Sequence, residues 1–228
     1  MKHKSVFFWL ALVMGFIFIP VAHKSQLLPI TGEIEQYINK VVPNTNSTKQ
    51  DQNVSQSSSV ESTTTTEQTP LESNVEGKRL SSTYYYHFAQ GVPQSVKTAF
   101  KYAIQTYNQT GVVKLVAGTG TQKQNQITFS TYRKVMSAQQ QGTIELGRGG
   151  PEIITQVGFG AYTANHAQAS LNINYPGLIK NSVAIHELGH ALGLAHSSSQ
   201  RSVMYPIDRG RTTLTDADIN GLKKIYDQ

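Results

Sequence analysis

The clearest periodic pattern of apolar and polar residues in the chain covers Gln94–Asn108. Its apolar positions recur every three or four residues, as on a helix with one buried face: Val96, Ala99, Phe100, Ala103, Ile104 and Tyr107. Pro93 precedes the stretch and Gly111 follows it, which suits the two ends of a helix. The pattern therefore predicts an amphipathic helix over these residues.

Short apolar stretches on both sides of this helix predict strands. Thr83–Phe88 is rich in tyrosine and precedes the helix, whereas residues 112–116 and 126–130 follow it. A parallel pair of strands joined through a helix implies a right-handed crossover. The predicted order of elements in this part of the chain is therefore strand, helix, strand, strand.

The next stretch, residues 131–156, has no such regularity. It contains Gly142, Gly147, Gly149, Gly150 and Pro151, so we expect a long loop with room for a short strand at 143–146. Two further strands are predicted at 157–164 and 169–175. Residues 215–226 close the chain as a helix that Thr215 can cap.

The first 80 residues differ in composition from the rest. Residues 6–22 carry no charge and follow a short basic start, which predicts an export signal over 1–25, either a cleaved signal peptide or an uncleaved membrane anchor. The absence of a clean small-x-small cleavage site favours the anchor. Residues 26–80 are predicted to form a short amphipathic helix at 28–42 and then a disordered linker rich in Ser, Thr and Gln. The folded domain is expected to cover 81–228.

Three histidines stand close together in the run HELGHALGLAH. His186 and His190 are four residues apart and share one face of a helix, so they can bind one metal ion together. Gly193 stands where a left-handed backbone conformation would end that helix and bring His196 to the same ion. Three nitrogen ligands leave one zinc position open, as in catalytic zinc sites, and Glu187 is placed beside the metal as a general base.

The residues after this run extend the pattern. The run SVMYP at 202–206 resembles the methionine turn of the metzincin zinc metallopeptidases. HELGHALGLAHS followed by VMYP is most similar to the matrixin branch, in the manner of a bacterial peptidase family M10 catalytic domain. The resemblance implies that Met204 forms an apolar floor beneath the zinc. It also implies that Tyr205 and Pro206 begin the wall of the substrate's specificity pocket.

The same resemblance implies an α+β fold with a twisted, mostly parallel five-stranded sheet and three helices. Residues 157–164 would then be the edge strand to which an extended substrate adds. Gly160 and Leu171 stand where animal matrixins have histidines for a structural zinc, and His166 is isolated. We therefore expect one zinc ion, held by His186, His190 and His196, and no second one.

Other ligands and partners have less support. Calcium in the 131–156 loop is possible but unsupported, because Glu145 and Glu152 are the only acids there. The last helix contains Asp218, which by resemblance braces the methionine turn. No basic cluster with interleaved aromatic residues is present, so no nucleic-acid partner is expected, and we expect a monomer.

Composition bears mainly on location. The chain of 228 residues has no cysteine, so an exported form must be held together by packing and bound metal instead of disulfide bonds. The absence of cysteine also excludes the latency of animal matrixins, in which a propeptide cysteine occupies the zinc. The seven basic and seven acidic residues of 1–80 cancel, so the net charge of +6 resides on 81–228. That charge suits a solvated surface or contact with an anionic cell wall.

The sequence therefore predicts an extracellular zinc endopeptidase, secreted or anchored to the cell membrane, that cleaves a protein or peptide substrate. Zinc would activate a water molecule and Glu187 would take its proton. Two alternatives stay open: a non-catalytic zinc module that binds peptide or cell wall, and a zinc amidase acting on peptidoglycan. Intact Glu187 argues against the first alternative, and the matrixin-like motif does not favour the second.

Overall fold

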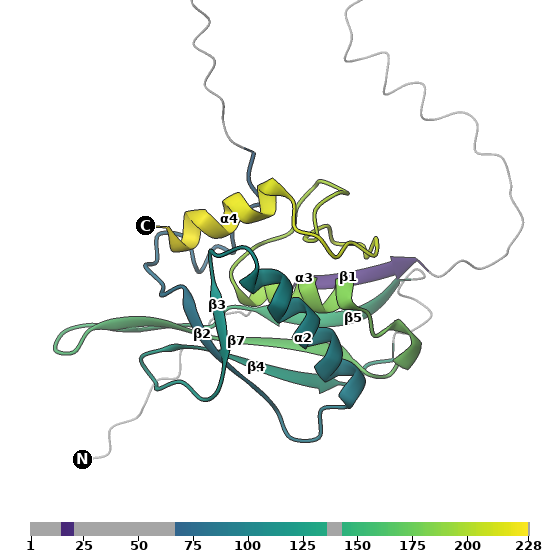
Figure 1. Cartoon of the computed structure of the whole chain (residues 1–228), viewed down its shortest axis with the longest axis horizontal. Helices are drawn as coiled ribbons and strands as arrows, with labels where there is room; N and C mark the ends of the chain where they lie inside the picture. Colours follow the sequence, from purple (N-terminus) through teal and green to yellow (C-terminus); the bar gives the residue numbers. More distant parts are fainter. Residues whose placement is uncertain (1–14, 21–66, 136–142, 228) are drawn as a thin grey trace, which may run out of the picture. The chain divides into compact units, whose positions relative to one another are not determined.

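A computed structural model of the chain describes residues 15–20, 67–135 and 143–227. Its strands form one mixed sheet with the order β1-β5-β7-β4-β2-β3, and β6 adds to β7 beyond the end of β5 (Figure 1). The strands are β1 (Gly15–Pro20), β2 (Thr83–Phe88), β3 (Lys114–Ala117), β4 (Asn125–Tyr132), β5 (Thr143–Gly150), β6 (Ile153–Gln156) and β7 (Tyr162–Asn172). The pairs β2·β3, β2·β4 and β4·β7 are parallel, whereas β1, β5 and β6 pair antiparallel.

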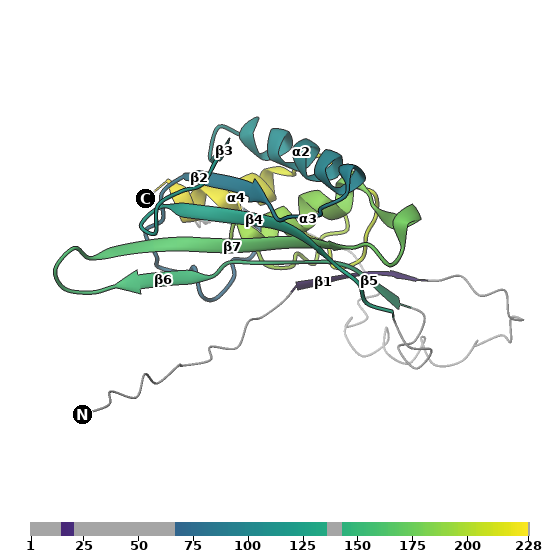
Figure 2. The same ribbon diagram turned by 90° about the horizontal axis from the view of Figure 1, so that it is seen from below.

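Three α-helices are found in the described residues: α2 (Gln94–Asn108), α3 (Asn181–Ala191) and α4 (Asp216–Tyr226). A short 3-10 helix, η1 (Pro176–Leu178), precedes α3. Helices α2 and α3 pack against each other on one side of the sheet, and α3 lies against β5 and β7 (Figure 2). The predicted sheet with three helices is therefore confirmed as a mixed sheet, in which three strand pairs are parallel and three are antiparallel, and it has seven strands where five were expected.

The core lies between these helices and the sheet. The six apolar positions predicted for α2 are all buried, and every second residue from Asn125 to Phe129 of β4 is buried. The Phe100 ring of α2 stacks on the Phe129 ring of β4 with 4.4 Å between ring centroids. The buried face of α2, which repeats every three or four residues, and the buried face of β4, which repeats every two, thus form one apolar layer.

The prediction of an edge strand at 157–164 is wrong. Residues 157–161 form the turn of a hairpin, in which Gly158 and Gly160 adopt φ of +86° and +73°, a region that favours glycine. Strands β6 and β7 run into and out of this turn, and the hairpin extends beyond the rest of the sheet (Figure 2). The strands predicted at 157–164 and 169–175 are in fact one strand, β7.

Strand β5, which pairs with β7 on the side opposite β4, lies inside the stretch expected to be a loop. Its glycines hide the alternation of apolar and polar residues that marks a strand, and only residues 143–146 of it were predicted. Backbone pairing with β7 from Gly147 to Gly150 nevertheless holds it extended. Strand β1 pairs antiparallel with β5, from Gly15 opposite Gly149 to Pro20 opposite Thr143.

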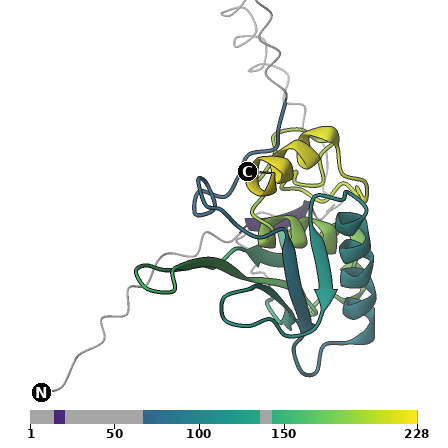
Figure 3. The same ribbon diagram turned by 60° about the vertical axis from the view of Figure 1, so that its left-hand side comes forward.

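Residues 67–80, which their composition assigns to the linker, pack on the domain instead. Val75 and Leu80 are buried in the core, and the backbone of Thr69 donates a hydrogen bond to Ala217 at the start of α4. This stretch runs alongside α4 before it reaches β2 (Figure 3). Most of the predicted export signal, the helix at 28–42 and the linker up to residue 66 lie outside the described residues. No helix in the described parts of the chain is long and apolar enough to cross a membrane.

Candidate metal centre

Helix α3 carries His186 and His190, and it ends before His196, which the following turn brings back to them. His186 and His190 lie one turn apart and are both 1% exposed. The helix ends in a Schellman motif, in which the Leu194 N–H donates to Gly189 and the Gly193 N–H donates to His190, both at 2.9 Å. Gly193 has φ of +101°, which a residue with a Cβ rarely adopts, so the predicted role of this glycine is confirmed.

The turn at Gly193 brings His196 to the other two imidazoles. One ligand nitrogen from each histidine lies within 4.8 Å of the others, and the ring centroids are 4.6 to 5.3 Å apart. Burial, followed by the neighbouring His190, lowers the pKa of His196 to about 4, and burial also holds the pKa of His186 well below its usual value. Both rings are therefore neutral at neutral pH, the state in which imidazole binds metals.

The donor set fits a zinc ion. Nε2 of His186 and Nε2 of His190 are 3.0 Å apart, so these two atoms face a common point. Nε2 of His196 is buried and has no hydrogen-bond partner, and the same holds for both carboxylate oxygens of Glu187. Buried polar atoms without partners are costly, and a metal with its ligand shell would satisfy them.

Glu187 is enclosed by strand β5. A Cβ on Gly147 would stand 2.5 Å from Oε1 of Glu187, and a Cβ on Gly149 would collide with the Glu187 carbonyl oxygen. Burial raises the pKa of Glu187 well above its usual value, and the charge of Glu145 raises it further. The glycines of β5 are therefore required for the strand to approach α3 this closely.

Glu145 itself is held by two cations. Lys134 Nζ and Arg148 Nε donate to its two carboxylate oxygens at 2.5 and 2.6 Å. Burial alone would raise the pKa of Glu145, but the hydrogen bonds from these two cations outweigh burial and leave the pKa below its usual value. Glu145 therefore stays ionised near Glu187.

The methionine turn lies beneath the helix. Met204 is fully buried, and a Cβ on Gly189 would collide with its sulfur and come within 2.6 Å of the Tyr107 hydroxyl. The carbonyl oxygen of Val203, one residue before Met204, lies 2.8 Å from Nδ1 of His186. The structure thus places Met204 below the helix turn between the two histidines and uses its neighbour to orient His186.

Asp218 joins this turn to two other segments. Its Oδ1 accepts hydrogen bonds from the hydroxyls of Ser202 and Thr69 at 2.5 and 2.6 Å. Its Oδ2 accepts from the backbone N–H groups of Thr215 and Val203 at 2.9 and 3.4 Å, and from the Thr215 hydroxyl at 2.8 Å. The contact with the methionine turn that the family resemblance implied is present.

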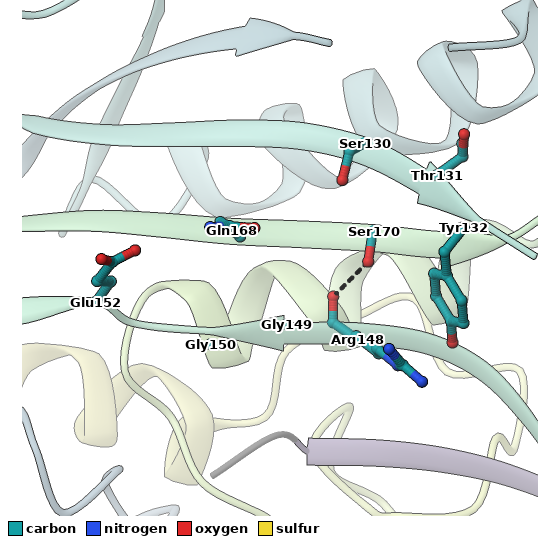
Figure 4. A pocket seen from close by; sticks show the side chains of 9 residues that line it. All are labelled: Ser130, Thr131, Tyr132, Arg148, Gly149, Gly150, Glu152, Gln168 and Ser170. Atoms are coloured by element: carbon teal, nitrogen blue, oxygen red, sulfur yellow. Dashed lines mark hydrogen bonds between the residues drawn. The ribbon is translucent and has the colours of Figure 1, made fainter. Parts of the chain in front are cut away.

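Two cavities lie near the metal helix and strand β5. A cavity of about 10 Å³ beside His186 is lined by Tyr205 and by Arg209 and Arg211, whereas Pro206 is absent from its lining. A larger one of about 180 Å³ crosses β4, β7 and β5 and contains none of the three histidines (Figure 4). The role of Tyr205 and Pro206 as a specificity wall stays a prediction, and the chemistry belongs to the histidine cluster.

Comparison with known families supports the same assignment. The family model described as Matrixin matches residues 83–227, which covers the sheet from β2 to β7 and helices α2 to α4. The chain belongs to the matrixin family. The zinc implied by that family agrees with the three-histidine cluster of this matrixin.

Individual relatives are similar over a short stretch. Metalloendoproteinase 1 of Glycine max is 52% identical over 48 residues, which are 20% of this chain and 16% of that protein. Matrilysin of Rattus norvegicus is 54% identical over 48 residues, 19% of this chain and 18% of that protein. The match thus spans less than a fifth of either relative's length.

A solved structure has a weaker likeness. High choriolytic enzyme 1, a hatching enzyme zinc-protease from Oryzias latipes, aligns with a TM-score of 0.38 and 14% identity over 70% of this chain and 94% of that one. The assignment of this matrixin rests on the family match and the histidine motif instead.

Sequence reasoning found the histidines, Glu187 and Met204 but missed the residues around them. The spacing of Gly147 and Gly149 was a usable signal for a strand in close contact with another backbone. No local signal marks Glu72, whose carboxylate lies 3.0 Å from Nδ1 of His190 across 118 residues of sequence. His166 contacts the carbonyl of Gln122 and the side chain of Gln126, and the absence of a second zinc stays a prediction.

Proposed function

We propose that this matrixin is a zinc-dependent endopeptidase that uses Glu187 as its general base. The observation that carries the proposal is the Glu187 carboxylate, fully buried beside three convergent imidazoles with neither oxygen bonded to the protein. A carboxylate in that state has no evident structural task. It is suited to accept a proton in a reaction at the metal.

Zinc held by His186, His190 and His196 would supply Lewis-acid chemistry, which acidifies water and polarises a carbonyl oxygen. Glu187 would accept a proton from the attacking water and then donate it to the amine that leaves. Burial and Glu145 raise the pKa of Glu187, which increases its strength as a base. No covalent bond to the protein is needed, because water is the nucleophile.

Strand β5 is the proposed platform for the substrate. It touches Glu187 through Gly147 and Gly149, so a peptide extended along its outer edge would pass close to the histidines. Strand β1 pairs antiparallel with that edge, but its residues 15–20 belong to the predicted export signal. Cleavage of the signal, or its insertion into a membrane, would free the edge for a substrate strand. The backbone groups of β5 would select an extended peptide and leave side-chain preference to the pocket region near Tyr205.

We also propose that the protein works outside the cell, either secreted or anchored through its N-terminal segment. The support is the uncharged run of residues 6–22 after a basic start. Fractionation of cells into membrane and medium, with N-terminal sequencing of the mature protein, tests this directly. A mature chain recovered only from the cytoplasm would contradict it.

The activity test uses the full chain with zinc and a library of quenched fluorescent peptides. The matched variant is Glu187→Gln, which keeps the side-chain shape but removes the base, with Glu76→Gln at an exposed site as control. We expect cleavage by the wild type and the control, and a loss of at least about 100-fold in Glu187→Gln, in the range of general-base effects. Zinc content of each variant is measured in parallel.

Two outcomes would refute the proposal. Stoichiometric zinc with no cleavage of any peptide by the wild type would favour a binding module. Equal cleavage by wild type and Glu187→Gln would remove Glu187 from the chemistry.

A further inference from the structure

A segment upstream of the family match lies across the end of the metal helix. The Glu72 N–H donates to the Gly193 carbonyl, and the Ala195 N–H donates to the Pro70 carbonyl, both at 2.8 Å. Leu71 and Leu194 form an antiparallel bridge between these bonds. The segment is thus paired with the backbone that leads from His190 to His196.

The anchoring on both sides of Glu72 is firm. Before it, the Thr69 hydroxyl donates to Asp218 at 2.6 Å, and after it Val75 is 1% exposed. A Cβ on Gly193 would stand only 3.0 Å from a methyl group of Val75, which shows how closely the segment follows the turn. The backbone of Glu72 is therefore held in place independently of its side chain.

The side chain of Glu72 reaches the second histidine. Its Oε1 lies 3.0 Å from Nδ1 of His190, and the residue is 8% exposed, which is unusual for a glutamate. Because a carboxylate only accepts, the hydrogen of a neutral His190 must be on Nδ1. Nε2 then has its lone pair free, and this atom faces Nε2 of His186 at 3.0 Å.

The other two imidazoles are supported differently. His186 has the Val203 carbonyl oxygen 2.8 Å from its Nδ1, and the ring of His196 has its Nε2 buried without a partner. His190 alone is oriented by a carboxylate among the described residues. A carboxylate accepts more strongly than a carbonyl and raises the basicity of the ligand.

We propose that Glu72 is a positioning residue of the zinc site, which fixes the ring orientation and tautomer of His190 and strengthens it as a ligand. The proposal rests on the zinc-dependent function proposed above. It places part of the metal site in residues 67–80, before the stretch that the family model matches. A chain that began at Ser81 would lack this support.

The test measures zinc affinity of the full chain by competition with a chromogenic chelator. Glu72→Leu removes the acceptor, Glu72→Gln keeps an amide oxygen that can accept from Nδ1, and Glu76→Gln changes an exposed glutamate four residues later. We expect zinc affinity to fall roughly 10- to 100-fold in Glu72→Leu, the range for lost partners of metal-bound histidines. Glu72→Gln should recover most of this loss, and the control should equal the wild type.

Two further readouts separate positioning from packing. The absorption spectrum of the cobalt-loaded protein reports ligand geometry and should shift in Glu72→Leu. The melting temperature of the metal-free chain reports packing and should fall little compared with the zinc affinity. If Glu72→Leu does not fold, Glu72→Asp replaces it, because its carboxylate stops about 1.5 Å short of His190, and it should lose affinity likewise.

The results distinguish the two proposals. A wild type that binds no zinc would contradict the proposed function itself. A wild type that binds zinc tightly, with unchanged affinity and cobalt spectrum in the Leu or Asp variant, would overturn the role of Glu72 alone. A loss of metal-free stability with unchanged zinc affinity would also overturn it.

Discussion

Replacement of Asp218 by alanine would disconnect three segments at once. The carboxylate accepts five hydrogen bonds, two on Oδ1 from hydroxyls and three on Oδ2, and it is fully buried. Hydrogen bonds to a charged group contribute about 1.5–3 kcal/mol each but are not additive. We therefore expect Asp218→Ala to lower the free energy of unfolding by about 3–5 kcal/mol, because the backbone N–H groups of Val203 and Thr215 would each lose their acceptor at a cost of about 1–3 kcal/mol.

The geometry also predicts that Asp218→Asn is milder. The two backbone N–H groups on Oδ2 cannot reverse, whereas the Ser202 and Thr69 hydroxyls on Oδ1 can rotate and accept. Asparagine can therefore place its amide nitrogen toward the hydroxyls and keep its oxygen for the backbone. We expect a loss of about 1–2 kcal/mol, since neutral hydrogen bonds replace charge-assisted ones.

The assay is urea unfolding of the zinc-loaded chain, with thermal melting as a second measure. In a domain of this size about 1 kcal/mol shifts the melting temperature by about 2–4 °C, so Asp218→Ala should melt about 6–20 °C lower. Asp216→Ala, an exposed aspartate in the same helical turn, is the control and should change stability by less than about 0.5 kcal/mol. A loss under 1 kcal/mol in Asp218→Ala, or equal losses in the Ala and Asn variants, would refute the reasoning.

Three more outcomes are expected. Gly149→Ala should push β5 away from Glu187 and reduce peptide cleavage roughly 100-fold, the effect of a displacement of about 1 Å. Gly177→Ala is the control and should keep its activity, because no atom lies within 4 Å of its added Cβ. Equal activity of the Gly149→Ala variant and the wild type would contradict the close contact. In the folded chain the pKa of Glu145 is below its usual value of 4.5, so its ion pairs contribute their full stability above pH 4.5, and this contribution is lost as the pH falls from there through the folded-state pKa. The melting temperature should therefore drop less steeply in Glu145→Gln than in the wild type between pH 6 and 3, and parallel curves would contradict this. A chelator should abolish cleavage and lower the melting temperature. Added zinc at about 100 times its dissociation constant should raise the free energy of unfolding by about 2.7 kcal/mol. A melting temperature that changes with neither chelator nor zinc would contradict a metal bound by the folded state.

The sequence determined the parts of this protein whose signals are local. Helix α2 and strand β2 have the predicted bounds, because a 3.6-residue period and a tyrosine-rich strand are each legible within one window. The same applies to His186, His190 and Gly193, since the helix repeat and a left-handed turn fix their relative places. Thr215 caps α4 as expected, through a reciprocal bond with Asp218.

Only the tertiary structure decided what lies around the histidines. Strand β5 has too few side chains to show a pattern, and it is a strand because β7 pairs with it and because glycine lets it touch α3. Residues 67–80 look like linker by composition, yet backbone bonds to Gly193 and Ala195 and the burial of Val75 order them. The contact of Glu72 with His190 is the product of that packing. A long-range hydrogen bond of this kind has no counterpart in local periodicity, so only the folded chain could reveal it.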